Sequence, residues 1–334
     1  MDGICTLAND CVYDQLIALL NSIEAVLGLD TPVCIYPYDD NIEQIAGAIA
    51  NRPNVQLYRD RDSMQKWDSF ARSAWDTHPT ARQRLGLEDN KGYHRFGTHR
   101  RYCAFDGPFD RFLYMDADTL LMGAIAPIFA QLKQNDCIVY DFQYKDLTHV
   151  YEVSSSKLTE VFSSERLRAE IFCSGFYASK KDLFDEEKRN WLLDCLRSGE
   201  AEILYPMAPD QTLINYMMMR SHCSIYNFSL ELPKEQRTGC SVTSKHFQER
   251  DNLLYDKGNC LTYLHYIGIS SYFFKQVCVG ENIEFPYRDI FLYYRYLHEP
   301  EQRPIFDNKP KPYQKPSSFA NKLFKKLGLS VEGK

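Results

Sequence analysis

The chain opens with three short apolar runs separated by two segments of helical periodicity, and this order strongly limits the folds available to it. We interpret the runs as strands and the segments between them as helices. A strand–helix–strand–helix–strand order favours a parallel sheet with helices on both faces, because each crossover returns the chain to the same edge. The predicted strands cover residues 3–8, 32–36 and 55–58, and the predicted helices cover residues 13–27 and about 40–50.

Polar residues follow the first two predicted strands directly. Asn9 and Asp10 come after the first strand, and Asp39 and Asp40 come after the second. Asp39 and Asp40 are also the predicted caps of the second helix. Because open parallel sheets bind ligands outside the carboxyl ends of their strands, these residues are candidates for ligand contacts by position alone.

Further apolar runs extend the predicted sheet through the rest of the chain, so that the expected fold is a mostly parallel α/β sheet flanked by helices. The predicted strands cover residues 111–121, 137–141, 171–179 and 261–267, and the predicted helices cover residues 182–196 and 209–219. We expect one domain over residues 1–300, with an insertion or lid at 60–95, a proline-rich linker at 301–316 and a basic tail at 317–334.

Composition excludes several classes of function. The chain has 334 residues, with 39 Lys and Arg against 45 Asp and Glu, and a net charge of −6 argues against general nucleic-acid binding. The 11 cysteines include no C-x-x-C pair, so they indicate neither a zinc site nor a disulfide framework and favour a reducing, cytoplasmic compartment. No apolar window of about 18 residues is present, and the N-terminal residues do not resemble a signal peptide.

Two aspartates interrupt the strand predicted over residues 111–121. Asp116 and Asp118 follow an apolar run and would point to the same side of the strand end, where they can share a hard divalent cation. A D-x-D pair alone is weak evidence, and the chain holds a second one at Asp60 and Asp62. That pair is flanked by arginines and indicates an ion-paired surface turn, whereas acids in an apolar stretch need a partner cation.

Five sequence blocks, in order, resemble the GT-A glycosyltransferases, in particular the retaining family 8 type that includes glycogenin and bacterial galactosyltransferases. Each block is weak alone, and the resemblance lies in their order and spacing over about residues 3–270. The blocks are LANDCVY at residues 7–13, FLYMDAD at 112–118, FCSGF at 172–176, DQTLIN at 210–215 and HYIG at 265–268.

The resemblance implies a role for each matching residue. Asp116, Asp118 and His265 would ligate Mn²⁺ or Mg²⁺, and Asp210 and Gln211 would be the catalytic pair that faces the donor sugar and the reaction centre. The implied donor-binding residues are Ala8, Asn9, Asp10, Arg101, Ser174, Gly175, Gly268 and Lys275.

The chemistry of such a site fits these residue types. When the sugar is transferred, the diphosphate of the donor is the leaving group, and a divalent cation neutralises its negative charge. The sugar passes through an oxocarbenium-like state that a carboxylate or amide oxygen stabilises, and Asp210 or Gln211 supplies one. The resemblance further implies a UDP-sugar donor and retention of anomeric configuration.

The chain departs from the family pattern at two places, and one further position is matched with an uncertain offset. Cys173 stands where the family usually has Asn, and Ser271 stands where it has a Lys that meets the diphosphate, for which Lys275 is the nearest replacement. The family's basic residue, about 15 positions before the D-x-D, falls on Arg100 or Arg101, and we favour Arg101.

Structural explanations exist for several of these residues. A lone His in an aromatic strand, such as His265, is most often a packed core residue. Asp210 follows Pro209 and would serve as a helix N-cap with no catalytic duty. Ser174 and Gly175 would then mark only a close crossing of two strands.

The C-terminal tail is basic and amphipathic. Residues 309–334 hold seven Lys and one Glu, and Phe319, Leu323, Phe324 and Leu327 fall on one helical face. This pattern predicts peripheral contact with an anionic membrane, where each Lys contributes on the order of 1 kcal/mol. A helix docked on the acidic body, or a segment without fixed structure, would fit the same residues.

Other functions fit parts of the pattern. A haloacid dehalogenase-type phosphatase also places D-x-D after an apolar strand, but its Thr comes four residues after the first Asp, whereas Thr119 comes three after Asp116. A nucleotide-sugar binding module without turnover fits the departures at Cys173 and Ser271, and a nucleotidyltransferase would release pyrophosphate instead of a nucleoside diphosphate. The sequence best predicts a metal-dependent glycosyltransferase that uses a nucleotide-sugar donor and a glycan, lipid-linked or protein acceptor.

Overall fold

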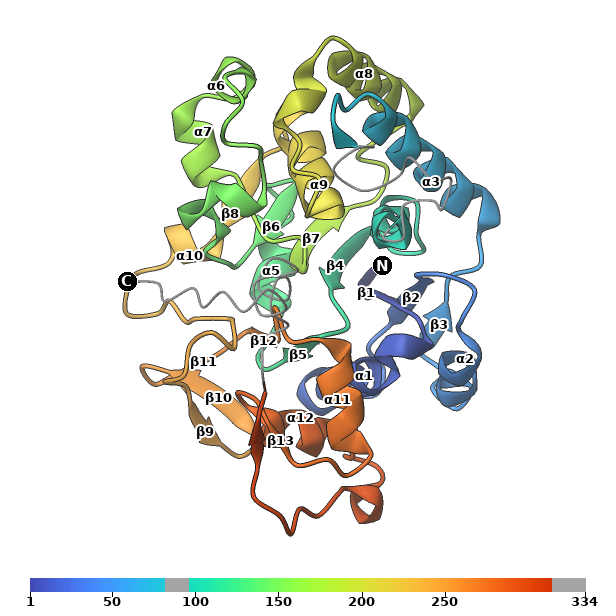
Figure 1. Ribbon diagram of the computed structural model, residues 1–334, viewed down its shortest axis with the longest axis vertical. Coiled ribbons are helices and arrows are strands. Elements are labelled where there is room, and N and C mark those ends of the chain that lie inside the picture. Colours follow the sequence, from blue (N-terminus) through green and yellow to red (C-terminus); the bar gives the residue numbers. More distant parts are fainter. Residues whose placement is uncertain (82–95, 314–334) are drawn as a thin grey trace, which may run out of the picture.

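The computed structural model describes residues 1–81 and 96–313, and its centre is a seven-stranded sheet with helices on both faces (Figure 1). The predicted α/β fold class is therefore confirmed. The strands lie in the order β3 (Val55–Leu57), β2 (Val33–Pro37), β1 (Asp2–Ala8), β4 (Arg111–Met115), β7 (Phe176–Lys180), β6 (Cys137–Val139) and β8 (Ile225–Asn227).

Most neighbouring strands of this sheet run parallel. Strand β1 pairs in parallel with β2 and with β4, so that Ile4 lies between Val33 and Leu113. Strand β7 is the exception, because it pairs antiparallel with both β4 and β6. The carboxyl ends of β1, β2, β4 and β6 therefore meet at one edge, and the first residue of β7 lies there as well.

Alternate residues of β1 enter two different cores. Cys5 and Leu7 pack in a cluster with α3 (Arg61–Asp76), α8 (Glu186–Arg197) and α9 (Pro209–Arg220). Ile4 and Ala8 pack in a second cluster with α1 (Tyr13–Leu27), α2 (Glu43–Ile49) and α5 (Ala126–Gln131). A strand that is buried on both faces has a continuous run of apolar residues in its sequence. This pattern predicted a parallel sheet covered by helices on both faces.

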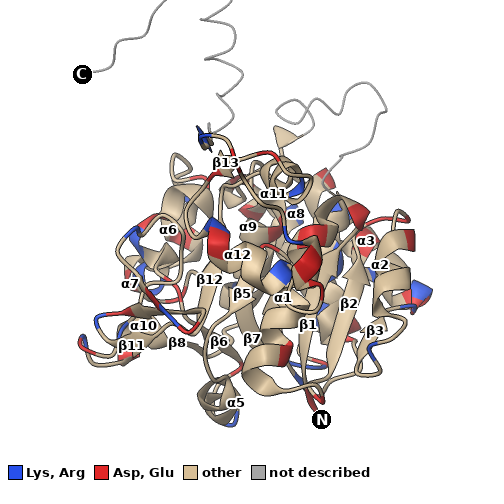
Figure 2. Ribbon diagram, turned by 90° about the horizontal axis from the view of Figure 1, so that it is seen from below, with Lys and Arg blue, Asp and Glu red and all other residues tan. Residues whose placement is uncertain are grey.

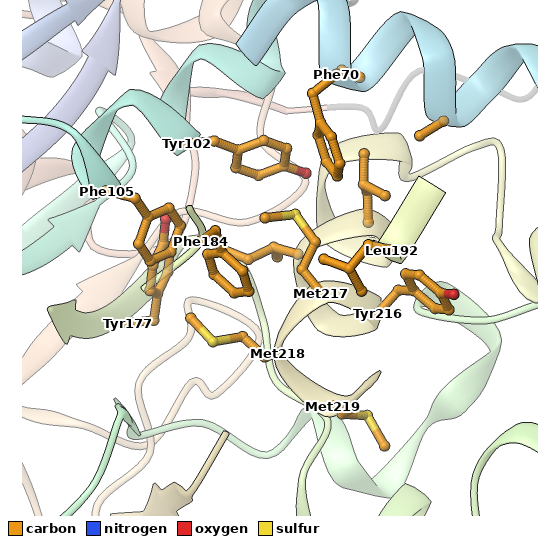
Figure 3. Close-up of a cluster of buried hydrophobic side chains, with 14 of the residues drawn as sticks. Phe70, Tyr102, Phe105, Tyr177, Phe184, Leu192, Tyr216, Met217, Met218 and Met219 are labelled. Carbon is orange, nitrogen blue, oxygen red and sulfur yellow. The ribbon is translucent and has the colours of Figure 1, made fainter. Parts of the chain in front are cut away.

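Helix α9 lies deep in the first core. Its methionines fill the space beside the aromatic side chains, and Figure 3 shows Met217 between Tyr102 and Leu192. Unbranched, polarizable methionine side chains adapt to such irregular gaps. The firm packing of α9 fixes the position of its N-terminal residues, which reach the functional site described below.

Shorter helices complete this half of the molecule. They surround the outer strands β6 and β8 in Figure 1. They are α6 (Lys157–Val161), α7 (Ser164–Ala169) and α10 (Phe228–Glu231). A 3₁₀ segment over Phe96–Phe105 lies elsewhere, against α3 and β1.

The C-terminal elements form a third core against α1. It includes α11 (Ser271–Cys278), α12 (Arg288–Arg295) and the antiparallel pair β5 (Thr119–Leu121) and β12 (Tyr263–His265). A small sheet of β9 (Gln248–Arg250), β10 (Leu253–Asp256) and β11 (Asn259–Cys260) lies beside it. Because β5 follows the D-x-D directly, its pairing with β12 brings His265 to the aspartates.

Two predicted boundary regions take part in the fold. Within the predicted insertion, α3 buries Trp67 and Phe70 in the first core, and residues 82–95 lie outside the described residues. Within the predicted linker, β14 (Lys311–Pro312) pairs with β13 (Ile283–Glu284), which attaches the end of the described chain to the domain. The predicted tail at 317–334 lies outside the described residues.

Two local predictions were wrong. The cap of α2 is not Asp39 or Asp40: the helix begins at Glu43, and Asp10 accepts hydrogen bonds from the amides of Gln44 and Ile45 at 3.0 Å each. The strand predicted over residues 171–179 begins only at β7, because side chains from neighbouring elements bind the backbone of residues 172–174 in place of a strand ladder.

Charged residues are concentrated on helices and loops, whereas the central strands contain few of them (Figure 2). Among residues 1–81 and 96–313, no helix combines the length and the apolar character needed to cross a bilayer.

Candidate donor and metal site

The candidate site forms at the sheet edge where the carboxyl ends of β1, β2, β4 and β6 meet. Asn9 follows β1, Asp116 follows β4 and Asp141 lies just beyond β6. Gly175 precedes β7, which runs the other way, so it faces the same edge. Polar residues that are distant in sequence are thus brought together by the parallel topology.

Asp116, Asp118 and His265 form a three-residue cluster. One potential ligand atom from each residue lies within 4.8 Å of the others. The His265 Nε2 lies 3.4 Å from the Asp118 carboxylate, and the Tyr266 amide donates to the Asp118 carbonyl at 2.9 Å. The predicted ligand set is therefore assembled by two elements, the β4–β5 turn and β12.

Arg101 lies at the centre of the polar groups beside this cluster, and its side chain is almost completely buried. Its guanidinium contacts the Asp116 carboxylate at 3.2 Å and the Asp210 carboxylate at 2.9 Å. It also donates to the Ser174 carbonyl and hydroxyl at 2.9 and 3.0 Å, and to the Thr98 carbonyl at 3.0 Å. Arg101 thus cross-links the D-x-D, the segment that precedes β7, and α9.

Arg100, the other candidate for the basic position, points elsewhere. It pairs with Asp68 of α3 at 3.1 Å. Of the two neighbouring arginines, the structure therefore places the favoured one, Arg101, at the site.

The protonation of the cluster reflects burial and close charges. Burial raises the pKa of Asp116 above its ordinary value, although Arg101 opposes the rise. Burial also acts to raise the pKa of Asp118, but His265 outweighs it, and the pKa of Asp118 lies below its ordinary value. Burial lowers the pKa of His265, but the Asp118 carboxylate outweighs it and holds that pKa well above the usual range.

The charge balance of the site favours a bound cation. Three carboxylates, on Asp116, Asp118 and Asp210, face one guanidinium, on Arg101. With His265 neutral, as a metal ligand must be, the buried group carries two uncompensated negative charges. Two carboxylates and an imidazole suit Mn²⁺ or Mg²⁺, so the residues present fit the predicted ion.

The N-terminus of α9 holds the predicted catalytic pair. The suggested N-cap role of Asp210 was wrong, because the N-cap of α9 is Ala208 and the Asp210 carboxylate turns to Arg101 instead. The Gln211 side chain is held at both ends: its oxygen accepts from the Ser174 amide at 3.2 Å, and its nitrogen donates to the His149 carbonyl at 2.8 Å.

The end of β1 is held by its own side chains. Asn9 is buried, donates to the Asp39 carboxylate at 2.9 Å and accepts from the Cys11 amide at 3.1 Å. Asp10 fixes the start of α2, as described above. Ala8 is the last residue of β1 and is buried. Contacts of Ala8, Asn9 and Asp10 with a nucleotide stay predictions.

The residues after β12 are placed less centrally. Gly268 adopts φ +79°, a left-handed conformation that favours glycine, in the turn after His265. Ser271 is the first residue of α11, and Lys275 lies exposed on the same helix. Within the described chain, the structure gives Lys275 no ion pair with the cluster, so its contact with a diphosphate stays a prediction.

Asp141 and Asn215 were not among the predicted site residues. The buried Asp141 carboxylate accepts from the amides of Gln143 at 2.7 Å and Cys173 at 3.1 Å, and burial raises its pKa to about 7. Asn215 exchanges two hydrogen bonds with the backbone of Phe172, each at 2.9 Å. The signal for Asp141 was present in the sequence, because it ends a predicted strand as Asn9 does.

Gly175 leaves the space in which the cluster assembles. A Cβ at this position would lie 2.5 Å from His265 Cε1 and 2.9 Å from Asp116 Oδ2. We therefore expect Gly175→Ala to displace two ligands and weaken Mn²⁺ binding about tenfold or more, as measured by calorimetric titration.

Gly47→Ala is the matched control for this substitution. Its Cβ would meet nothing within 4 Å on α2, and the change is expected to leave Mn²⁺ affinity unchanged while stabilising the helix by roughly 0.5–1 kcal/mol. Equal Mn²⁺ affinity in Gly175→Ala and the unaltered chain would contradict the assignment of Asp116 and His265 as ligands.

Comparison with known proteins gives matches by structure alone. No family profile and no curated protein matches the sequence. The apo structure of the bifunctional glycosyltransferase WbbM is similar with a TM-score of 0.51 and 14% identity, over 90% of this chain and 51% of that chain. This chain therefore spans about half the length of WbbM.

Further similar solved structures have lower scores. The galactosyltransferase LgtC in complex with donor and acceptor sugar analogues has a TM-score of 0.49 and 16% identity, over 83% of this chain and 94% of that chain. The apo form of glycosyltransferase GlyE from Streptococcus pneumoniae has a TM-score of 0.44 and 12% identity, over 92% of this chain and 66% of that chain. The sheet topology and the likeness to WbbM together show that this chain has the mixed α/β fold of the GT-A glycosyltransferases.

Proposed function

We propose that the chain is a metal-dependent glycosyltransferase that moves a sugar from a nucleotide-sugar donor to a glycan, lipid-linked or protein acceptor. The observation that carries the proposal is the joining of the Asp116–Asp118–His265 cluster to Asp210 through one buried arginine, Arg101. This arrangement lies at the edge of the sheet where α/β folds bind ligands. The GT-A fold supports the same function by analogy.

Each part of the site has a role in this proposal. Asp116, Asp118 and His265 would hold Mn²⁺ or Mg²⁺, which when bound neutralises the charge of the departing diphosphate. Arg101 fixes the orientation of the Asp210 carboxylate, which lies beside the expected position of the donor sugar. A carboxylate there stabilises positive charge that develops on the sugar ring. A UDP donor and retention of configuration rest on the family 8 resemblance.

A nucleotide-sugar binding protein without turnover is the second candidate. Two observations favour it: Cys173 replaces the expected Asn, and Lys275 lies on an exposed helix face. It predicts metal-dependent binding of the donor without release of a nucleoside diphosphate. The predicted membrane contact of residues 317–334 stays a separate proposal.

The test is a thermal-unfolding panel of nucleotides, nucleotide-sugars and phosphomonoesters, each with Mn²⁺ and with EDTA. We expect one nucleoside diphosphate and its sugars to stabilise the chain only with Mn²⁺, by about 2.7 kcal/mol at 100 times the dissociation constant. No Mn²⁺-dependent stabilisation by any nucleotide would contradict the proposal. Release of nucleoside diphosphate from the stabilising donor then separates the transferase from the binding protein.

A further inference from the structure

A second cavity lies among the C-terminal elements, outside the cluster described above. It has a volume of about 830 Å³ and is lined by Val242, Thr243, Lys245, Glu249, Ile267 and residues 284–290 and 312–313. Pockets of roughly 300–1,000 Å³ accept ligands of drug-like size, comparable to a short oligosaccharide. None of the roles proposed so far uses this cavity.

The cavity adjoins the candidate metal site through one short stretch of chain. Ile267 lines it, and His265 is only two residues earlier, a distance that the backbone spans in at most about 7 Å. The Ile267 side chain is 43% exposed, so it offers apolar surface to a molecule in the cavity. A molecule in the cavity would therefore reach toward the place where the donor sugar is expected.

Tyr287, which lines the cavity, is hydrogen-bonded to the metal-ligand segment. Tyr266 is buried, and its hydroxyl donates to the Tyr287 carbonyl at 2.9 Å. The Tyr287 hydroxyl in turn accepts from the Phe247 amide at 3.2 Å, and the Tyr287 and Phe247 rings stack with centroids 5.6 Å apart. This network preforms the cavity, as expected of a binding site.

Tyr287 also carries a strained backbone. Its φ of +57° is left-handed, which is an outlier for a bulky aromatic residue. Such strain persists only where the surroundings enforce it, and it is frequent at ligand-binding sites. Here it places the half-buried Tyr287 ring in the cavity lining.

The lining combines ring faces with acids. Tyr287 and Tyr313 provide flat, half-buried aromatic surface, and Glu249, Glu284 and Asp289 provide exposed carboxylates. Carboxylates accept hydrogen bonds from hydroxyl groups, and aromatic faces pack against the C–H faces of sugar rings. Among the described residues that line the cavity, two are basic, Lys245 and Arg288, and three are acidic, so the lining has a net charge of −1, which disfavours anionic ligands.

We propose that this cavity is a subsite for a neutral acceptor oligosaccharide, which holds the sugar residues distant from the reacting hydroxyl. The proposal rests on the proposed glycosyltransferase function and assigns the acceptor class to it. Binding at the subsite fixes the acceptor through residues that take no part in the bond exchange. The reacting end then extends past Ile267 toward the donor.

The test measures direct binding of the full chain to an array of neutral di- to tetrasaccharides of glucose, galactose, mannose and N-acetylhexosamines, without donor or metal. We expect at least one of them to bind. We expect Thr243→Trp, which places an indole in the lining, to weaken that binding at least tenfold. Thr159→Trp, exposed on α6 at the far side of the molecule (Figure 1), is the matched control and should bind as the unaltered chain does.

The outcomes separate this proposal from the function on which it rests. Saccharide binding that Thr243→Trp abolishes supports the subsite even if no nucleotide binds, whereas the Mn²⁺ panel tests the donor site alone. The subsite is overturned if no saccharide of the array binds, or if Thr243→Trp binds them as well as the control.

Discussion

Replacing Asp118 by asparagine is expected to abolish the Mn²⁺-dependent stabilisation by the donor, with affinity lowered at least about 100-fold. The amide keeps the size of the side chain but removes the negative charge that a hard cation needs. Changes to residues that merely orient a ligand already lower metal affinity about 10–100-fold, so loss of a ligand should exceed that range. Because the Asp118 side chain is 25% exposed, the fold itself should tolerate the change.

The second D-x-D provides the control for this experiment. Asp62 lies exposed in the first turn of α3, far from His265 in the chain, and Asp62→Asn should change stability by no more than about 0.5 kcal/mol. Donor affinity with Mn²⁺ should be unchanged in Asp62→Asn and lost in Asp118→Asn, as measured by calorimetric titration. Unchanged donor affinity in Asp118→Asn would exclude the proposed metal site.

The two D-x-D pairs also show what the sequence could and could not distinguish. The arginines beside Asp60 and Asp62 predicted an ion-paired surface turn, but the pair instead begins a helix: Asp60 is the N-cap of α3, and Asp62 lies exposed in its first turn. The apolar run before Asp116 predicted a strand end, which is the end of β4. The residues next to each pair distinguished the two, because charged neighbours indicate an exposed acid and apolar neighbours indicate one that is partly buried.

Long-range order was predictable only where periodicity was strong. The helix expected at 13–27 matches α1, and the parallel order of β1, β2 and β3 follows from the crossovers between them. The antiparallel position of β7 between β4 and β6 was not predicted, because a run of apolar residues does not show in which direction the strand runs. For the same reason the placement of Asp141 beside Cys173 had to come from the structure.

Side-chain hydrogen bonds account for most of the local errors. Asp10 caps α2 from another strand end, and Asp210 turns away from its own helix toward Arg101. A sequence shows which residues can cap a helix, but the partner that satisfies a carboxylate depends on what the fold brings within reach. In both cases the competing partner lies more than 30 residues away.

Replacing Arg101 by methionine is expected to destabilise the chain by about 3–5 kcal/mol, because it leaves the buried Asp210 carboxylate and the half-buried Asp116 carboxylate without their shared cation. Arg101→Lys should recover little of the loss, since one ammonium cannot match a planar guanidinium that contacts two carboxylates and two carbonyls at once. Denaturant unfolding at neutral pH, in the absence of Mn²⁺, measures the difference.

The neighbouring arginine makes the comparison specific to the buried network. Arg100 pairs with Asp68, with each side chain 23% exposed, so Arg100→Met should cost only about 1 kcal/mol. Adding Asp210→Asn to Arg101→Met should restore part of the lost stability, because it removes one uncompensated charge. If Arg101→Met costs no more than Arg100→Met, or if Asp210→Asn adds to its cost, Arg101 does not hold the two carboxylates together, and the link between the metal cluster and Asp210 fails with it.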